Sequence, residues 1–246
     1  MQGFKDSNLR IWKEDLALGR EQSKQLRSRF IYEAVRNGID LFELHVKNYR
    51  FRVEARDMRH SEGLIQAFRQ IWYYAEAYEE VWTYEEAQDS IADLQDCFVA
   101  IDKLGYVVAV AGGYAAKSHK DERMKRHLRT VEKAYYVAEL GRVPVVRGFR
   151  IGAFLFELLM LIRIAQSDEE FILNTAEFGD LARTKDNPAK RLYESHGYTR
   201  FCDKRGNVLT RSFSKERACG EIIVDVRPYY YATADSFLSS VGLTLR

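Results

Sequence analysis

Residues 135–165 read Tyr-Tyr-Val-Ala-Glu-Leu-Gly-Arg-Val-Pro-Val-Val-Arg-Gly-Phe-Arg-Ile-Gly-Ala-Phe-Leu-Phe-Glu-Leu-Leu-Met-Leu-Ile-Arg-Ile-Ala. The segment from Ala134 to Leu140 is rich in aromatic, β-branched and small residues, which predicts a strand. Pro144 has no N–H to donate, so the strand must end or splay near it. A short turn from Arg147 to Gly152 follows. The run beyond it is apolar except for two charges, which predicts a buried helix.

A strand, a glycine-containing turn and a buried helix in this order can form an anion site. The first turn of a helix has unpaired N–H groups and the positive end of the helix dipole. Glycine allows a ligand to approach the backbone closely, and Arg147 and Arg150 add positive charge. An ordinary turn with surface arginines would give the same pattern, so this stretch alone leaves both interpretations open.

A second motif lies at residues 186–198, Asp-Asn-Pro-Ala-Lys-Arg-Leu-Tyr-Glu-Ser-His-Gly-Tyr. It predicts a short helix, because Asp186 or Asn187 can cap its start, Pro188 suits its first turn and Gly197 can end it. His196 lies on a different helical face from the tyrosine of the motif and is predicted to be a surface residue.

This motif resembles the second signature of the GNAT superfamily of N-acyltransferases, Asn-x-x-Ala-x-x-Leu-Tyr followed by Gly-Phe or Gly-Tyr. The turn before the buried helix is similar to that superfamily's acyl-CoA pyrophosphate loop, Gln/Arg-x-x-Gly-x-Gly/Ala. The two occur in the right order, with a strand-like segment from Glu170 to Thr175 between them. Two positions depart from the pattern. Arg150 replaces the first glycine, and Asp186 stands at the asparagine position, with Asn187 one residue later.

The resemblance implies an α/β GNAT fold, with a mixed, mostly antiparallel sheet whose central strands splay apart and are flanked by helices. It implies that the chain is an N-acetyltransferase with acetyl-CoA as cosubstrate. Backbone amides near Leu140 and Val143 would hold the pantetheine arm and polarise the acyl carbonyl. The remaining cofactor-binding residues implied are Arg147, Gly148, Phe149, Arg150, Gly152, Ala153 and Asn187.

Two residues are candidates for proton transfer. A lysine-like amine with a pKa near ~10.4 is almost fully protonated at neutral pH, so a base that removes its proton speeds attack on a thioester. Glu139 lies where the resemblance places a carboxylate beside the acceptor, although a strand end facing solvent is the alternative. Tyr193 occupies the position of the phenol that protonates the departing thiolate, although packing would also explain it. No Ser/His/Asp or Cys/His set has the spacing for an acyl-enzyme, which favours direct transfer to a primary amine in a ternary complex.

Two other functions stay open. The same fold could use a longer acyl-CoA or an acyl-carrier protein as donor. A non-catalytic GNAT-like domain could instead bind CoA or a partner. The acceptor, a small-molecule or peptide amine, is not identified by the sequence.

Composition limits the class of protein. The chain has 246 residues, 46% hydrophobic and 30% charged, with a formal net charge of +2. These values describe a globular protein without a general attraction to nucleic acid, and a nucleic-acid partner is not expected. Three cysteines without ligand spacing predict no metal site and a reducing compartment. The absence of an apolar leader and of a long apolar run predicts a cytoplasmic protein with no membrane partner.

Three regions are predicted. Residues 1–48 form a helical N-terminal extension that packs on the core or on a partner, because apolar residues recur there at helical spacing. Residues 49–227 form the GNAT domain. Residues 228–246 form a tail that either continues the sheet or supports a homodimer.

Within the domain, Tyr49–Asp57 is predicted as its first strand, and helices are predicted at 61–81 and 84–96. The aromatic cluster from Trp72 to Tyr84 is either core packing or the lining of the acceptor pocket. Strands follow at 97–102 and 106–115.

In the second of these strands, Gly112 and Gly113 predict a bulge or a close-packing site. The basic run at 117–133 is predicted to be a solvated helical excursion, with contact to the 3′-phosphate of CoA or to an acidic acceptor as the alternative. Strands at 198–203 and 220–226 are joined by a polar connection.

Overall fold

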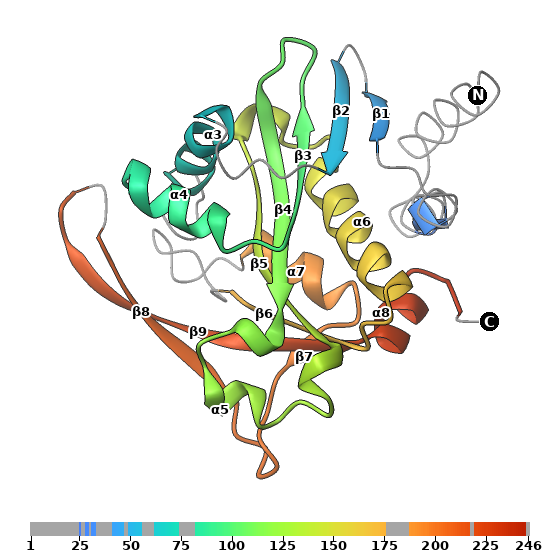
Figure 1. Cartoon of the computed structure of the whole chain (residues 1–246), viewed down its shortest axis with the longest axis vertical. Helices are drawn as coiled ribbons and strands as arrows, with labels where there is room; N and C mark the ends of the chain where they lie inside the picture. The colour runs from blue at the N-terminus through green and yellow to red at the C-terminus, as the bar shows by residue number, and fades with distance from the viewer. Residues whose placement is uncertain are drawn as a thin grey trace.

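The computed structural model describes residues 25, 28–29, 31–32, 41–46, 49–55, 62–73, 82–175, 187–216 and 219–244. In these ranges nine strands form one sheet in the order β1-β2-β3-β4-β5-β6-β9-β7, with β8 paired to β9 (Figure 1). The strands are β1 Leu41–Val46, β2 Tyr49–Ala55, β3 Asp96–Ile101, β4 Val107–Ala115, β5 Ala134–Arg142, β6 Glu170–Asn174, β7 Thr199–Arg200, β8 Thr210–Glu216 and β9 Ile222–Thr233. The predicted α/β class with a mixed, mostly antiparallel sheet is confirmed.

Helices cover both faces of the central strands. They are α3 Glu62–Tyr73, α4 Tyr84–Ala92, α5 Glu122–Lys125, α6 Ile151–Ala165, α7 Pro188–Glu194 and α8 Ala234–Ser240, with single turns η1 Ala116–Ser118, η2 Val131–Lys133 and η3 Pro144–Val146. Figure 1 shows α3 and α4 on one side of β3, β4 and β5, with α6 and α8 on the other. Most α6 residues are buried, as its apolar run predicts.

The central strands splay at β5 and β6, the one parallel pair among the described strands. Their pairing covers only Ala134–Tyr136 of β5, whereas the whole of β6 pairs with β9. The cause lies in β5 itself, where Ala138 is an extra residue with no partner on β4. Such a bulge bends the strand that carries it, and β5 therefore leaves β6 just before Glu139.

The predicted role of Gly112 and Gly113 is confirmed at this bulge. The register between β4 and β5 shifts between the two glycines. A Cβ built on Gly113 would lie 2.2 Å from the Tyr136 carbonyl oxygen, and one on Gly112 would lie 2.7 Å from the Asp96 carbonyl oxygen. Only glycine lets the three strands approach this closely.

Three element predictions are corrected. Leu41–Val46, predicted as helical, is the strand β1, because its apolar residues also alternate with polar ones and β2 offers an edge to pair with. The polar connection after residue 203 contains β8, which pairs along β9. The helix that begins at Tyr84 ends at Ala92, and β3 begins at Asp96.

The predicted boundary between residues 227 and 228 falls inside β9, so the start of the tail continues the sheet. In the N-terminal extension, the described residues between 25 and 32 are helical, and Ser28 and Ile31 are buried. The rest of that extension, and residues 74–81 of the predicted first helix, lie outside the described residues. Among the helices that are described, none is both long and apolar enough to cross a membrane.

Candidate functional site

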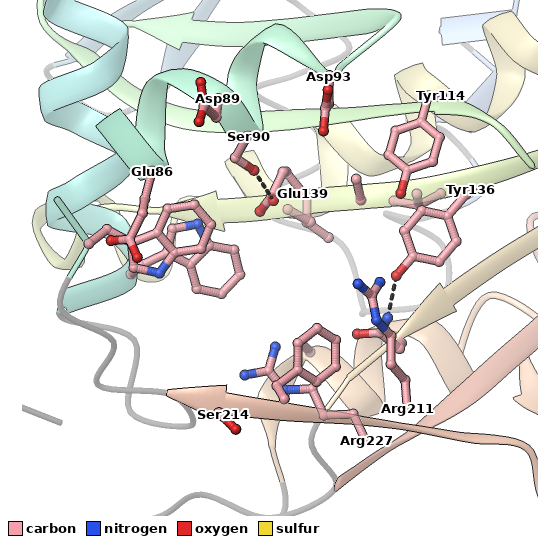
Figure 2. Close-up of a pocket in the computed structure, with 18 of the residues that line it drawn as sticks. Glu86, Asp89, Ser90, Asp93, Tyr114, Tyr136, Glu139, Arg211, Ser214 and Arg227 are labelled. Carbon is pink, nitrogen blue, oxygen red and sulfur yellow. Dashed lines mark hydrogen bonds between the residues drawn. The ribbon is translucent and has the colours of Figure 1, made fainter. Parts of the chain in front are cut away.

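A cavity of about 650 Å³ lies where β5 leaves β6. Helix α4 and strand β5 form one wall, and the β8–β9 hairpin forms the wall opposite (Figure 2). Its lining includes Trp72, Trp82, Glu86, Ser90, Asp93, Tyr114, Tyr136, Glu139, Leu140, Asn174, Tyr193, Arg211, Phe213 and Arg227. Its volume is in the range of pockets for small ligands.

Glu139, the predicted base, faces this cavity. Its side chain is only 8% exposed, so it is not the solvent-facing strand end that was the alternative. The Ser90 hydroxyl on α4 donates to Glu139 Oε1 at 3.0 Å (Figure 2). This hydrogen bond fixes the carboxylate at the place where the bulge opens the sheet.

Tyr193 reaches the same cavity from α7. Its ring is 6% exposed and packs against Phe156 and Tyr198, with centroid separations of 5.4 and 6.0 Å. The structure therefore brings both predicted proton-transfer residues together, although 54 positions in the sequence separate them. The packing interpretation of Tyr193 and its predicted chemical role are compatible.

Asn187, rather than Asp186, caps α7. Its Oδ1 accepts the Ala189 N–H at 2.9 Å, and its Nδ2 donates to Thr175 Oγ1 at 3.1 Å. The side chain is 3% exposed and ties α7 to the end of β6. Asn187 thus positions the helix that carries Tyr193, and its predicted direct contact with CoA stays a prediction.

The two backbone positions predicted to hold the pantetheine arm differ in the hydrogen bonding of their N–H groups. The Val143 N–H donates to the Val108 carbonyl at 2.9 Å, so this N–H is already used within the sheet. Contact of Val143 with CoA through its other atoms stays a prediction. Along an antiparallel ladder, pairs of residues that are hydrogen-bonded alternate with pairs that are not. Because Val143 is hydrogen-bonded to Val108, directly opposite it, the Leu140–Ala111 pair three positions away is not hydrogen-bonded. The Leu140 amide therefore points away from β4, toward the side where β6 has left.

The predicted pyrophosphate loop has a shape that fits a diphosphate. Gly148 and Arg150 have φ values of 88° and 58°, in the left-handed region. The Arg150 side chain makes no capping hydrogen bond at the start of α6. A Cβ on Gly148 or Gly152 would meet nothing within 4 Å. The loop thus presents backbone at a helix N-terminus to open space, next to the exposed Arg147, as an anion site requires.

The other two loop residues contribute differently. Phe149 is 8% exposed and packs in the core, so only its backbone can face a ligand. Ala153 is half-buried in the first turn of α6. Contact of these residues with CoA stays a prediction.

Aromatic rings line the floor of the cavity. Burial raises the pKa of Tyr114 to about 12 and that of Tyr136 well above its usual value. Both phenols therefore remain protonated at neutral pH, and the Tyr136 hydroxyl accepts a hydrogen bond from Asn174 Nδ2. Trp72 and Trp82 also line the cavity, and their rings stack with centroids 6.0 Å apart. These two rings of the aromatic cluster predicted from Trp72 to Tyr84 both line the cavity and pack against the core. That the cavity takes the acceptor stays a prediction.

His119 corrects the prediction of a solvated basic run. The turns η1 and η2 and the short helix α5 do form an excursion between β4 and β5, but His119 is 2% exposed. Its ring packs 4.3 Å from that of Tyr136, and Nδ1 accepts the Asp121 N–H at 3.0 Å. Burial, with a smaller effect from Arg211, lowers the pKa of His119 to about 4. The imidazole is therefore neutral beside the cavity.

His196 is also buried, at 1% exposure, rather than on the surface. Its Nε2 lies 2.8 Å from Glu157 Oε1 inside α6.

Sequence reasoning missed the arginines of the hairpin. Arg211 on β8 and Arg227 on β9 are direct cross-strand partners, and their guanidinium carbons lie 4.6 and 4.5 Å from the Phe213 ring centroid. The alternation of Arg211 and Phe213 with Thr210, Ser212 and Ser214 is typical of a strand, but the polar composition of this segment obscured the pattern. In the described ranges, no group of three or more His, Cys, Asp or Glu is placed to hold a metal.

The fold is shared with known acetyltransferases. No protein-family model matches the sequence, and no curated protein matches it. A GNAT-family acetyltransferase from Staphylococcus aureus Mu50 superposes with a TM-score of 0.51 and 13% identity, covering 75% of this chain and 99% of that one. A protein from Acinetobacter baylyi ADP1 proposed to be an acetyltransferase has a TM-score of 0.52 and 10% identity, covering 76% and 94%. A protein proposed to be a phosphinothricin N-acetyltransferase has a TM-score of 0.51 and 15% identity, covering 75% and 98%. The chain therefore has the fold of the GNAT acetyltransferases.

Proposed function

We propose that the protein is an N-acetyltransferase that transfers an acetyl group from acetyl-CoA to a primary amine by direct attack in a ternary complex. The observation that carries the proposal is the position of Glu139 and Tyr193. Both side chains line one cavity at the point where β5 and β6 separate. The fold shared with acetyltransferases supports the same reaction class.

The loop before α6 fits the diphosphate of CoA, as its open backbone and exposed Arg147 indicate. Acetyl-CoA would supply the activated thioester. The Leu140 N–H would donate to the acyl carbonyl oxygen. Glu139, directly or through one water, would take the proton that the amine nitrogen loses as the N–C bond forms. The Tyr193 phenol would give its proton to sulfur as the C–S bond breaks. After product release Glu139 would lose its proton to solvent and Tyr193 would regain one from solvent, so that both groups return to their starting states.

Calorimetric titration with acetyl-CoA, beside CoA and longer acyl-CoA species, tests the cofactor. We expect Arg147→Glu to weaken acetyl-CoA binding at least about tenfold, because a carboxylate would face the diphosphate. Lys103→Glu, in the exposed turn before β4, is the control and should leave the affinity unchanged. Equal binding by Arg147→Glu and wild type would remove the loop from the cofactor site.

Release of the CoA thiol in the presence of an amine panel tests the chemistry. Tyr193→Phe is expected to lower kcat about 10- to 100-fold while the dissociation constant for acetyl-CoA stays the same. Unchanged kcat would show that Tyr193 is not the acid. Preference for a long acyl chain in both assays would move the donor away from acetyl-CoA.

A further inference from the structure

We propose that the acceptor amine also carries an anionic group, a carboxylate or a phosphonate, and that Arg211 and Arg227 bind this group. The inference rests on the proposed N-acetyltransferase function and names the substrate class of the same cavity. It comes from the charges of the two walls, which are opposite in sign.

The arginine pair lies in an arrangement that a sheet normally avoids. Arg211 and Arg227 are directly opposite each other in the β8–β9 ladder, so their side chains leave the hairpin on the same face. Like charges at such positions repel each other, and Arg227 is only 8% exposed. The Phe213 ring contacts both guanidinium groups, which orients them through cation–π attraction. An anion placed between the two side chains would be attracted to both guanidinium groups.

Arg211 has the environment of a ligand-binding arginine. It is half-buried, and its Nη1 lies 3.2 Å from His119 Nε2. Among the described residues, no carboxylate forms an ion pair with it. His119 is neutral at physiological pH because its pKa is about 4. A guanidinium with a neutral neighbour keeps its charge for a carboxylate or phosphonate, which it can bind through two parallel hydrogen bonds.

The opposite wall is acidic. Glu86 on α4 and Asp93 at the C-cap of α4 line the cavity together with Glu139 on β5. Figure 2 shows these three on one side and Arg211 and Arg227 on the other. A ligand with an ammonium group at one end and an anion at the other matches both walls, and its nitrogen then lies at the Glu139 end. An amine without an anion, or a diamine, would offer Arg211 no anionic group to bind.

The arginines are not a second part of the predicted CoA site. All six loop residues, from Arg147 to Ala153 without Ile151, are in the described part of the chain, and none lines the cavity. The loop belongs to the start of α6, whereas the arginines belong to the hairpin across the cavity from β5. The two basic sites therefore fit two different anions.

Acetyl transfer to matched amines tests the proposal. The anionic amines are glycine, β-alanine, γ-aminobutyrate and aminoethylphosphonate, which vary the distance between nitrogen and anion. The neutral amines are ethylamine, propylamine and butylamine, and putrescine is the diamine. We expect at least one anionic amine to have a kcat/KM about 10- to 100-fold above that of every neutral amine and the diamine, as a charge-assisted contact predicts.

Variants at position 211 link this preference to the hairpin. Arg211→Gln should lower kcat/KM for the best anionic amine about 10- to 100-fold, mainly through KM, and change the neutral amines less than threefold. Arg211→Glu should shift the preference to putrescine. Arg205→Gln, on an exposed turn away from the cavity, is the matched control and should change nothing. Melting temperature and acetyl-CoA affinity confirm that each variant is folded.

The outcomes separate the two proposals. If acetyl-CoA does not bind, the proposed function fails and this inference fails with it. If acetyl-CoA binds and neutral amines or putrescine are acetylated as well as the anionic amines, or no amine of the panel is acetylated, the proposed substrate class is wrong. An anionic preference that survives both Arg211 variants and Arg227→Gln would also overturn the assignment to the hairpin.

Discussion

Glu139 lies in the bend of β5, held by Ser90 and within the cavity. If it takes the proton from the amine, Glu139→Gln should lower kcat about 10²- to 10³-fold near neutral pH. The loss should shrink as the pH approaches ~10.4, where a lysine-like amine no longer needs a base. A pH–rate profile measures both effects. The control Glu85→Gln removes an exposed carboxylate from α4, and a deficit in Glu139→Gln that is the same at every pH would contradict the role of base.

His119 couples the stability of the fold to pH. Its pKa is about 4 in the folded protein and 6.5 in an ordinary environment. As the pH falls from 6.5 to about 4, the unfolded state binds a proton that the folded state does not bind. The free energy of unfolding therefore falls in this window, by roughly 3 kcal/mol at most. Above pH 6.5 the contribution of His119 to the free energy of unfolding is constant.

Urea unfolding across this pH window measures the effect. His119→Phe keeps a ring against Tyr136 but removes the titration, so its stability should depend less on pH between 6.5 and about 4 than that of wild type. Equal slopes in the two proteins would show that His119 is protonated in the folded state.

The bulge between β4 and β5 depends on glycine, whereas the start of α6 does not. Gly113→Ala would place a Cβ 2.2 Å from the Tyr136 carbonyl, and we expect it to lower the free energy of unfolding by about 3 kcal/mol or more. Gly152→Ala meets no protein atom within 4 Å and should stabilise α6 by about 0.5 to 1 kcal/mol. Chemical denaturation compares the two variants, and a Gly113→Ala protein as stable as wild type would contradict the close approach of the strands.

The Gly152→Ala variant also distinguishes an effect on folding from an effect on cofactor binding. Because Gly152 faces the open side of the loop, its extra methyl group should weaken acetyl-CoA binding even though the fold gains stability. Calorimetry on Gly152→Ala tests this. Unchanged affinity would show that the ligand does not approach the backbone at this residue.

A buried polar network connects three distant parts of the chain. Ser28 of the N-terminal helical segment donates to Glu157 Oε2 at 3.1 Å, and His196 Nε2 lies 2.8 Å from Glu157 Oε1. All three side chains are at most 1% exposed. Glu157→Ala would leave its partners buried without their carboxylate and should cost about 3 to 5 kcal/mol. Chemical denaturation measures the loss.

The control for this network is an exposed ion pair. Lys133 and Glu169 are paired at the surface, with side chains 51% and 58% exposed. Glu169→Ala should cost less than about 1 kcal/mol. A loss for Glu157→Ala no larger than this would show that the network does not hold the three segments together.

Local patterns in the sequence determined the elements that carry the proposed chemistry. The buried helix α6, its preceding loop, the capped helix α7 and the glycine bulge each follow from residues adjacent in the chain, because propensity, capping and apolar periodicity act over a few residues. The residues Glu139 and Tyr193 could be singled out for the same reason.

The tertiary structure decided what depends on residues far apart in sequence. Strand β1 exists because β2 supplies its hydrogen bonds, and β8 because β9 does. The burial of His119 and His196 depends on rings and helices that the chain brings over them. The opposite charges of the two cavity walls come from α4 and from a hairpin about 120 residues later. No local sequence pattern indicates these contacts between distant residues, because the contacts form only when the sheet is complete.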